Sequence, residues 1–522
     1  MLREAMNSYA TNFNRLSLTP TQSIVGKSVC LIIPPSPFLL DERVFIHLGV
    51  LRVASSLERQ GVNVTVLDLS GVANYPDVLK IYFSNHTNDW VGITATTPQL
   101  PAAFSIARTI RLINHNMRLV LGGPHVTLSY SAQKVEQKLG TIGRGHQAVE
   151  VLENMFDVLI SGDGEYAAFL AFDPTCAKMI DGDDHRSALF MSNSQYEESP
   201  WPARHLIEME SYKYTIEGFP ATNLIAQLGC PFHCGFCGGR NSKSLRLIRT
   251  RSASSVVNEL EFLHKTYGYT GFMFYDDELN VNKNIVELMD AVSRLQNRLG
   301  VEFRLRGFIK AELFTELQAE AMYRAGFRWL LCGFEAANPR ILQNIEKRAT
   351  LENNTHTVEI AKKYGFKIKA LMSIGHPGES LESISDVKDW LIKMEVNDFD
   401  CTIITTYPGT PYYDLAVRSE QWSGIWTYTQ AKTGDRLHAY ELDYTTTPDY
   451  FKGDPNGGYK SYVFTDYISA EMLVIMRDQL ESEVRTGLDI KFNPGRPAIR
   501  YEHLMGQGLP SAIYRESGYK VP

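Results

Sequence analysis

Residues 227–239 read Gln-Leu-Gly-Cys-Pro-Phe-His-Cys-Gly-Phe-Cys-Gly-Gly, and this stretch sets the expected organisation of the chain. Its three cysteines, Cys230, Cys234 and Cys237, have the spacing C-x3-C-x2-C. Thiolates are the preferred protein ligands of iron–sulfur clusters, and closely spaced cysteines in one loop can hold one cluster. A four-iron cluster needs four ligands, so this loop leaves one iron open to a ligand that is not protein.

Three neighbouring cysteines could also form a zinc site or be plain core residues. Zinc usually takes four nitrogen or sulfur ligands, commonly from two separated pairs. Core cysteines have no reason to gather behind a Gly-Cys-Pro turn. The spacing therefore favours the cluster.

The other four of the seven cysteines are scattered. An odd, scattered set is not a disulfide framework, and it indicates a reducing cytoplasm, which an oxygen-labile cluster also requires. Cys30, Cys332 and Cys401 lie in apolar, strand-like runs, so we expect them in the core.

Length and composition are those of an ordinary globular protein. The chain has 522 residues, 44% of them hydrophobic and 21% charged, with a net charge of −7. With no basic block, it is not expected to be a general nucleic-acid binder. No run of about 18 apolar residues occurs, so no membrane span is predicted. Residues 1–25 lack the apolar core of a signal peptide and are expected to form a loose N-terminal extension.

Residues 26–172 are predicted to form a parallel sheet. Strands expected at 29–33, 62–69, 90–94, 118–121 and 157–160 alternate with helices such as 48–60 and 101–114. Such alternation gives βαβ units, in which ligands bind beyond the carboxyl ends of the strands. Four loops at those ends, 34–37, 94–98, 122–125 and 162–165, are rich in Gly, Pro, Ser or Thr. Turn chemistry explains any one of them, but four on one edge favour a ligand.

Residues 173–220 are polar and Pro-containing, and are predicted to be a linker. A second alternation follows over 221–411, with strands at 223–228, 271–275, 302–306, 329–332, 367–374 and 400–405. We expect a partial (β/α)6 barrel, similar to an open TIM barrel, with its site at the carboxyl ends of the strands. The cysteine loop follows the first of these strands.

Charged residues near other strands of this barrel are further candidates. Asp276 and Asp277 follow the second strand, and Glu335 ends the fourth. Arg304 and Arg306 lie on one face of the third strand. They could bind an anion if that face is the interior, or be surface charges if it is not.

These motifs resemble those of the radical S-adenosylmethionine (AdoMet) superfamily. The resemblance implies that Cys230, Cys234 and Cys237 hold a [4Fe–4S] cluster whose fourth iron binds AdoMet, and that Phe236 lies beside the adenine. The motifs at 274–282, 333–337, 375–379 and 408–411 are similar to those of the cobalamin-linked and methylthiotransferase-like branch. In that family the Gly-x-Glu glutamate contacts AdoMet, so the resemblance implies this role for Glu335. Adjacent acids are usually just solvated, but Asp276 and Asp277 follow a buried strand and could accept hydrogen bonds from the ammonium or ribose of AdoMet.

A second resemblance covers the N-terminal domain. Residues 49–54, Asp68, 122–125 and 162–165 are similar to the Rossmann-like cobalamin-binding domain that precedes many radical AdoMet modules. The Asp-x-His-x-x-Gly signature of cobalt-ligating histidines is missing, so no histidine is expected beneath the cobalt. The cofactor-binding candidates of this domain are Thr96, Gly122, Gly123, His125, Gly164 and Glu165.

Residues 412–522 are rich in aromatic residues, and a helix is predicted at 469–486 with Met472, Ile475, Met476 and Leu480 along one side. We expect a mixed C-terminal cap that closes the barrel and shapes a substrate pocket.

The combined resemblance implies a cobalamin-dependent radical AdoMet enzyme that C-methylates an unactivated carbon of a small molecule, using an electron donor such as flavodoxin or ferredoxin. One alternative keeps the radical chemistry but not the methyl transfer, giving a dehydration, rearrangement or cyclisation. Another is a non-catalytic cobalamin or iron–sulfur sensor. No catalytic acid or base is assigned.

Overall fold

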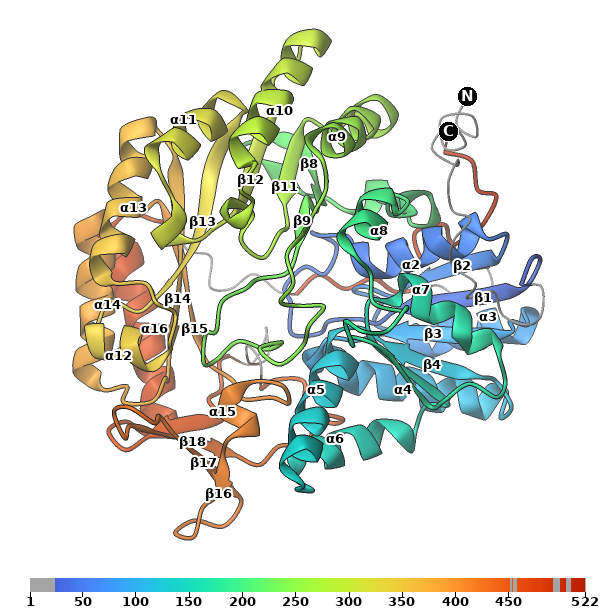
Figure 1. Cartoon of the computed structure of the whole chain (residues 1–522), viewed down its shortest axis with the longest axis horizontal. Helices are drawn as coiled ribbons and strands as arrows, with labels where there is room; N and C mark the ends of the chain where they lie inside the picture. Colours follow the sequence, from blue (N-terminus) through green and yellow to red (C-terminus); the bar gives the residue numbers. More distant parts are fainter. Residues whose placement is uncertain (1–23, 451–452, 454–457, 492–497, 504–507, 522) are drawn as a thin grey trace.

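The computed structural model describes residues 24–450, 453, 458–491, 498–503 and 508–521. Apart from its last two residues, the extension expected at 1–25 lies outside this part of the chain. Two large parallel sheets face each other across the molecule (Figure 1). In the part of the chain that the structure describes, no helix is both long and apolar enough to cross a bilayer.

The first sheet has the strand order β20-β2-β1-β3-β4-β5-β6. Its parallel strands pair in register along β1, β2 and β3, and only the edge strand β20 is antiparallel. The order reverses between β1 and β3, and such a switch point is where open α/β sheets bind ligands. The predicted Rossmann-like domain is confirmed. The strands are β1 (Ser28–Ile33), β2 (Asn63–Asp68), β3 (Trp90–Thr94), β4 (Leu119–Gly122), β5 (Val158–Gly162), β6 (Met179–Gly182) and β20 (Tyr514–Glu516).

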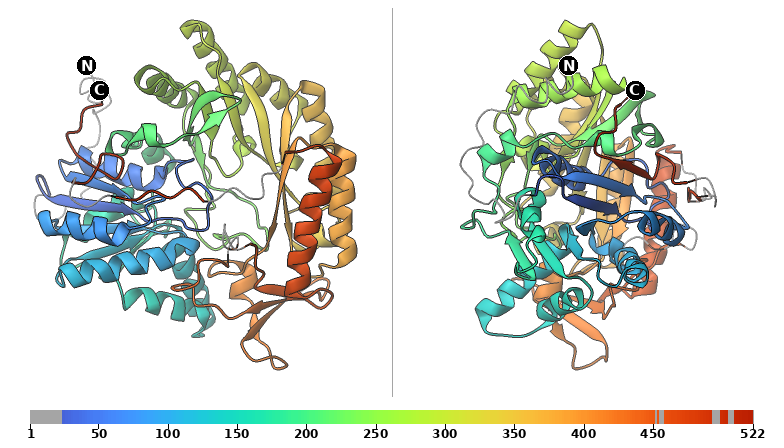
Figure 2. Two further views of the ribbon diagram at one scale, coloured as in Figure 1. Left: turned by 180° about the vertical axis from the view of Figure 1, so that it is seen from behind. Right: turned by 90° about the vertical axis from the view of Figure 1, so that its right-hand side faces the viewer.

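Apolar positions of these strands pack against helices on both sides of the sheet (Figure 2). Cys30 is fully buried in β1, as its apolar surroundings predict. The helices of this domain are α2 (Leu48–Arg59), α3 (Tyr75–Asn85), α4 (Leu100–Ile113), α5 (Pro124–Leu139), α6 (Arg144–Glu153) and α7 (Gly164–Ala167), with the 3-10 helix η1 (Thr97–Gln99) before α4.

Two strands of this sheet come from regions where none was expected. β6 lies within the stretch predicted to be linker, and β20 lies within the predicted C-terminal cap. Both strands are short and lie at an edge of the sheet. Neither is long enough to show the alternation of hydrophobic residues by which a strand is predicted from sequence. The N-terminal sheet therefore uses more of the chain than residues 26–172.

The second sheet is the predicted open half-barrel, with order β15-β14-β13-β12-β11-β8-β7. Six strands are parallel and adjacent in chain order, and β7 adds an antiparallel edge. The first and last strands do not pair, so the barrel stays open. The strands are β7 (Thr215–Ile216), β8 (Phe219–Leu224), β11 (Gly271–Phe274), β12 (Arg304–Ile309), β13 (Phe327–Glu335), β14 (Lys367–Ile374) and β15 (Asp398–Ile403).

Helices cover the outer face of this sheet, and Cys332 and Cys401 are buried in its strands as predicted. The covering helices are α9 (Ala253–Tyr267), α10 (Ile285–Leu299), α11 (Glu316–Arg324), α13 (Leu351–Tyr364), α14 (Leu381–Met394) and α16 (Ala470–Gly487). The shorter elements are α8 (Asn193–Glu198), α12 (Pro339–Asn344) and α15 (Pro411–Asp414), with η3 (Arg204–Leu206) in the crossover between the sheets.

Helix α16 is not part of a cap, although the sequence placed it there. It packs against α14 and β15 on the outside of the barrel (Figure 2), where it occupies the position of the sixth barrel helix. Its buried face carries Leu473, Leu480 and Val484. Met472 and Ile475 of the expected apolar side are exposed by 39% and 55%.

What remains of the expected cap is a small antiparallel sheet below the barrel in Figure 1. Its strands are β16 (Val417–Arg418), β17 (Ile425–Thr429), β18 (Arg436–Tyr440) and β19 (Val463–Thr465). Aromatic residues of the same region, including Tyr413, Tyr444 and Tyr450, pack into the core of the N-terminal domain. The C-terminal region thus contacts both domains.

A buried cluster of charges joins the crossover to the start of the barrel. Arg204 of η3 and Arg251 both donate to the carboxylate of Glu259 on α9. Arg204 also donates to the carbonyl oxygen of Asn223 on β8 at 3.0 Å. Burial opposes ionisation of Glu259, but the two guanidinium groups lower its pKa to about 2.

Replacement of Glu259 by Ala should destabilise the protein by about 3–5 kcal/mol, because two buried arginines lose their counter-charge. In the wild type this stabilisation is present above about pH 4.5 and is lost as the pH falls towards 2, since the folded-state pKa is the lower one. Denaturant titration would measure both effects.

The matched control is Glu261→Ala on the same helix. Glu261 pairs with Lys265 and Arg298, whose side chains are well exposed, so its loss should cost about 1 kcal/mol or less. Equal destabilisation by the two variants would contradict this account of the Glu259 cluster.

Candidate active site

The cysteine loop runs between two short paired strands, β9 (Gln227–Leu228) and β10 (Arg249–Thr250). It leaves the carboxyl end of β8 and lies between the half-barrel and α5 of the N-terminal domain (Figure 1). A Cβ atom added to Gly238 would lie 3.2 Å from Leu128 of α5 and 3.1 Å from the ring of Tyr407. The loop is thus in contact with both halves of the molecule.

Glycine is required where the loop begins. Gly229 has a φ of +88°, and a Cβ there would lie 2.2 Å from the carbonyl oxygen of Leu247. The next residue, Cys230, donates its backbone N–H to Leu245 at 3.0 Å. This close approach of backbones is why the motif starts with Gly-Cys.

The three cysteines all lie on this loop. Cys230 and Cys234 are half-buried and Cys237 is exposed. Within the described ranges, no three His, Cys, Asp or Glu side chains converge on a point where a single metal ion could sit. A cluster spreads its thiolate ligands over separate iron atoms, so it does not need such convergence. Three thiols on one accessible loop fit the donor set of a cluster with one open iron.

The protein makes the free thiol of Cys230 hard to ionise. Burial raises its pKa to about 11, and the charges of Glu278 and Asp277 contribute to the rise. A bound metal centre offsets this cost because it favours the thiolate.

Two aspartates of the N-terminal domain hold the cysteine loop. Asp183, just after β6, accepts hydrogen bonds from the hydroxyl of Ser242 (2.6 Å) and from the N–H and hydroxyl of Ser244 (both 2.7 Å). Asp163, just after β5, forms a buried ion pair with Arg249 at the loop's end. The position of the loop therefore depends on residues that precede it by tens of positions in the chain.

The acidic residues after β11 have different environments. Asp276 is buried, and its carboxylate accepts hydrogen bonds from the backbone N–H groups of Ala226 (3.1 Å) and Gln227 (2.5 Å). It therefore fixes the backbone that leads into the cysteine loop. Burial raises its pKa to about 7. Asp277 is exposed as a residue. Partial burial of its carboxylate raises the pKa of Asp277, and the backbone N–H of Gly229 opposes that rise.

Glu335 stands at the end of β13 with a left-handed φ of +65°. Its carboxylate accepts hydrogen bonds from Ser373 (2.7 Å) and Lys347 (3.1 Å). Although burial opposes it, the Lys347 charge lowers the pKa of Glu335 and keeps it ionised. A Cβ at Gly333 would lie 2.5 Å from the Glu335 carboxylate, which explains the glycine of the Gly-x-Glu motif.

His376 connects this glutamate to the cysteine loop. Its ring is fully buried, with one nitrogen 2.8 Å from the Ser373 hydroxyl and the other 3.4 Å from the Tyr412 hydroxyl. Its centroid lies 5.3 Å from that of Phe236, so the predicted adenine neighbour is on this side of the loop. Burial lowers the pKa of His376 to about 4, which leaves the imidazole neutral.

Sequence reasoning did not single out Lys347, Ser373 or His376 as site residues. Gly375-His376-Pro377 was recognised as a motif, and the histidine within it could have been predicted as a site residue. Ser373 is an ordinary inward position of β14, and Lys347 follows α12 in a polar stretch, so neither carries a local signal.

At the carboxyl edge of the first sheet, two predicted residues are accessible. Thr96 is exposed, and its hydroxyl donates to Gln99 at 2.9 Å. Gly122 has no atom closer than 3.9 Å to the position of a Cβ, whereas one at Gly123 would lie 2.7 Å from Thr94. An open backbone beside the β1/β3 switch point fits a flat ligand such as a corrin.

The other candidates of this domain have internal partners. His125 is buried between the hydroxyls of Thr97 (3.0 Å) and Ser129 (3.3 Å). Glu165 forms a buried ion pair with Arg52 (3.0 Å), and a Cβ on Gly164 would lie 2.8 Å from Val53. The structure gives these residues packing roles, and their contact with a cofactor stays a prediction.

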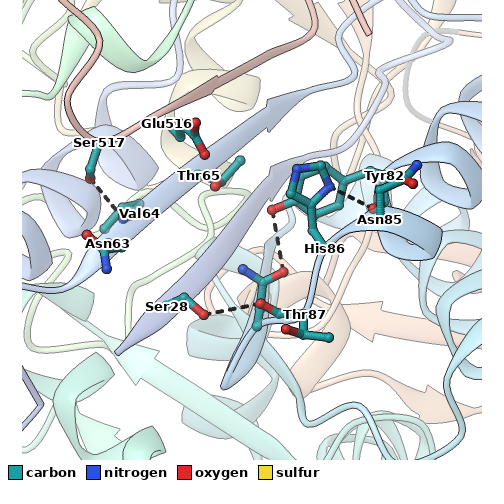
Figure 3. A pocket seen from close by; sticks show the side chains of 11 residues that line it. Ser28, Asn63, Val64, Thr65, Tyr82, Asn85, His86, Thr87, Glu516 and Ser517 are labelled. Carbon is teal, nitrogen blue, oxygen red and sulfur yellow. Dashed lines mark hydrogen bonds between the residues drawn. The ribbon is translucent and has the colours of Figure 1, made fainter. Parts of the chain in front are cut away.

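A polar pocket lies at the opposite edge of the same sheet (Figure 3). It is lined by Ser28 and Asn63, the first residues of β1 and β2, and by Tyr82 and His86 at the end of α3. Because it is at the amino ends of the strands, it is separate from Thr96, Gly122 and the cysteine loop.

Comparison with known proteins agrees with this geometry. The model of the radical SAM superfamily matches residues 224–391, and that of the B12 binding domain matches residues 42–153. An uncharacterised methyltransferase of Pyrococcus horikoshii is 28% identical over 418 residues, covering 77% of this chain and 82% of that protein. The anaerobic magnesium-protoporphyrin IX monomethyl ester cyclase of Rubrivivax gelatinosus is 26% identical over 316 residues, covering 58% of this chain and 54% of the cyclase.

The fold is also that of a solved enzyme. The radical S-adenosylmethionine methyltransferase TsrM of Kitasatospora setae, solved with cobalamin and a [4Fe–4S] cluster, superimposes with a TM-score of 0.61. The match covers 89% of this chain and 92% of TsrM at 17% identity, so it shows a shared fold.

Replacement of Asp183 by Ala should loosen the cysteine loop, because three hydrogen bonds to a buried carboxylate are lost together, at a local cost of about 2–3 kcal/mol. We expect reconstituted protein to retain less than about half of the wild-type iron after anaerobic gel filtration with a chelator.

The control for this experiment is Asp184→Ala. The Asp184 side chain pairs with its neighbours Arg186 and His185 at the surface, away from Ser242 and Ser244, so iron retention should stay at the wild-type level. Full iron retention by the Asp183 variant would show that the N-terminal domain does not position the loop.

Proposed function

The chain belongs to the cobalamin-binding radical SAM family, and on that premise we propose that it is a methyltransferase acting on a carbon atom of a small molecule. Its cofactors are a [4Fe–4S] cluster, AdoMet and cobalamin. When bound, the cluster supplies the electron that cleaves AdoMet, and cobalamin supplies a carrier for the methyl group.

The observation that carries the proposal is the position of the cysteine loop. One side of it contacts the barrel through the bond from the Gly235 N–H to Ile345 (2.8 Å), and the other contacts α5 through Gly238. Helix α5 begins directly after Gly122 and Gly123, at the edge where a corrin fits. A substrate held between the cysteine loop and this edge would then lie within reach of the residues that would hold each cofactor.

The residues around the loop have defined roles in this proposal. Cys230, Cys234 and Cys237 hold the cluster, and Phe236 packs beside the adenine. Glu335 stays ionised because of Lys347 and accepts hydrogen bonds from AdoMet. Asp277, exposed beside the loop, offers a second acceptor. Asp276 acts on the loop rather than on the ligand, since backbone N–H groups already occupy its carboxylate.

The name of the Pyrococcus relative, a methyltransferase, supports methyl transfer over other radical reactions. The scattered cysteines support a cytoplasmic location, where a flavodoxin or ferredoxin would supply electrons. The decisive test is anaerobic turnover with candidate substrates. Methyl transfer predicts a product heavier by one methylene. It also predicts that the amounts of 5'-deoxyadenosine and S-adenosylhomocysteine rise in proportion to each other.

A second candidate is a cyclisation without methyl transfer, favoured by the similarity to the Rubrivivax cyclase. It predicts 5'-deoxyadenosine without S-adenosylhomocysteine, and a product lighter than or equal in mass to the substrate. The same mass measurement therefore separates the two candidates.

Replacement of Cys234 by Ala should abolish both the cluster and the formation of 5'-deoxyadenosine, because a cluster held by two thiolates is not retained. Iron analysis and product chromatography measure the two effects. Cobalamin binding should persist, because Thr96 and Gly122 lie on a separate sheet.

The matched control is Cys176→Ser. Cys176 lies in the N-terminal domain and accepts a hydrogen bond from Arg118, and serine preserves that acceptor. It should leave iron content and turnover unchanged. Turnover by the Cys234 variant would rule out the proposed cluster site.

A further inference from the structure

The concave face of the half-barrel is the accessible face of its sheet. Along β12 the odd positions are buried against the outer helices, while Arg304, Arg306 and Phe308 are only partly buried. The same alternation occurs along β15. Side chains that point into the half-barrel are therefore open to a ligand.

The two arginines of this face differ in their partners. Arg304 is neutralised, with Glu302 at 2.6 Å and Glu217 at 3.4 Å. Within the part of the chain that the structure describes, Arg306 has no acidic partner, and its buried Nε makes no hydrogen bond. Its guanidinium lies 5.9 Å from the ring of Trp329.

Two lysines of β14 on the same face are already paired. Lys369 of β14 lies 3.0 Å from both Asp398 and Asp400, and Lys367 lies 2.7 Å from Glu217. Arg306 is thus a partly buried positive charge with no counter-ion beside it. A guanidinium in this state favours an anionic group, which it can bind with two parallel hydrogen bonds.

A series of aromatic rings continues from this charge towards the carboxyl end of β12. Phe308 lies two residues further along the same face of β12, and its ring is 6.0 Å from that of Tyr275. Tyr275 in turn lies 5.1 Å from Phe45, which lies 4.8 Å from Tyr214. Burial raises the pKa of the Tyr214 phenol, and the nearby Arg306 charge opposes that rise. Tyr275 is 44% exposed, so the aromatic wall is accessible.

The guanidinium is too far from the rim to serve AdoMet held at Glu335. Arg306 is level with Trp329 in strand register, and Glu335 follows six residues later on β13. At the rise of a β-strand, six residues span roughly 20 Å. A ligand at the rim and a ligand at Arg306 are therefore separate.

We propose that Arg306 anchors a carboxylate or phosphate of the substrate, while Tyr275, Phe308 and Phe45 contact its apolar body. The substrate is then an amphipathic organic anion, held at its charged end deep in the half-barrel with its other end towards the cysteine loop. This inference rests on the proposed function of the same site, and it names the class of substrate.

The test measures binding to the full chain loaded with cluster and cobalamin, by calorimetry under anaerobic conditions. The probes are 1-naphthoate, 1-naphthyl phosphate and the neutral 1-naphthamide, which share one apolar body. We expect at least one anion to bind about tenfold or more tightly than the amide, as a charge-assisted pair allows. Which anion does so identifies the charged group.

Arg306→Met should lose this preference for the anion, and its affinity for the amide and for AdoMet should stay within about twofold of wild type. Arg306→Lys keeps the charge and should keep most of the preference, so a loss in the Met variant is not a packing effect. Arg304→Met is the matched control on the same face and should keep the full preference.

The proposal is overturned if neither anion binds more tightly than the amide, or if Arg306→Met retains the preference. It is also overturned if Arg306→Met weakens AdoMet and leaves the anions unchanged. Binding needs no turnover, so an anion preference without methyl transfer would count against the proposed function alone.

Discussion

The buried carboxylate of Asp183 is the constraint on which the arrangement of the site depends. It accepts three hydrogen bonds from Ser242 and Ser244, and the ion pair of Asp163 with Arg249 fixes the same segment. Both aspartates stand just after edge-side strands of the first sheet. The cysteine loop therefore takes its position from the N-terminal domain as much as from the barrel strand that leads into it.

This shared support explains why the site combines residues from distant parts of the chain. Leu128 follows β4, Glu335 ends β13, and His376 follows β14, yet all lie around one loop. The buried polar chain from Lys347 through Glu335 and Ser373 to His376 satisfies its members with hydrogen bonds. Such a network holds a carboxylate ionised inside the protein, where an isolated one would take up a proton.

The two parallel sheets and the cysteine loop could be predicted from the sequence, because they depend on local patterns of residues. The parallel strands and the cysteine spacing are regular and close together in the chain. β6, β20 and the barrel position of α16 were missed, because short edge strands and the docking of a helix depend on distant partners. The two arginines of β12 could not be told apart, since only the fold shows that Glu217 reaches Arg304 and not Arg306. Lys347 likewise belongs to the site only because the fold brings it to Glu335, and the residues around it in the sequence do not indicate that contact.

The path of the C-terminal region has a consequence for the integrity of the first sheet. The chain passes from the first sheet to the barrel through η3, and it returns after α16 to add β20 to the first sheet. The barrel is therefore inserted between two segments of one sheet. A truncation that removes everything after the barrel would also remove β20, and it would expose β2 as a new edge strand of the N-terminal domain.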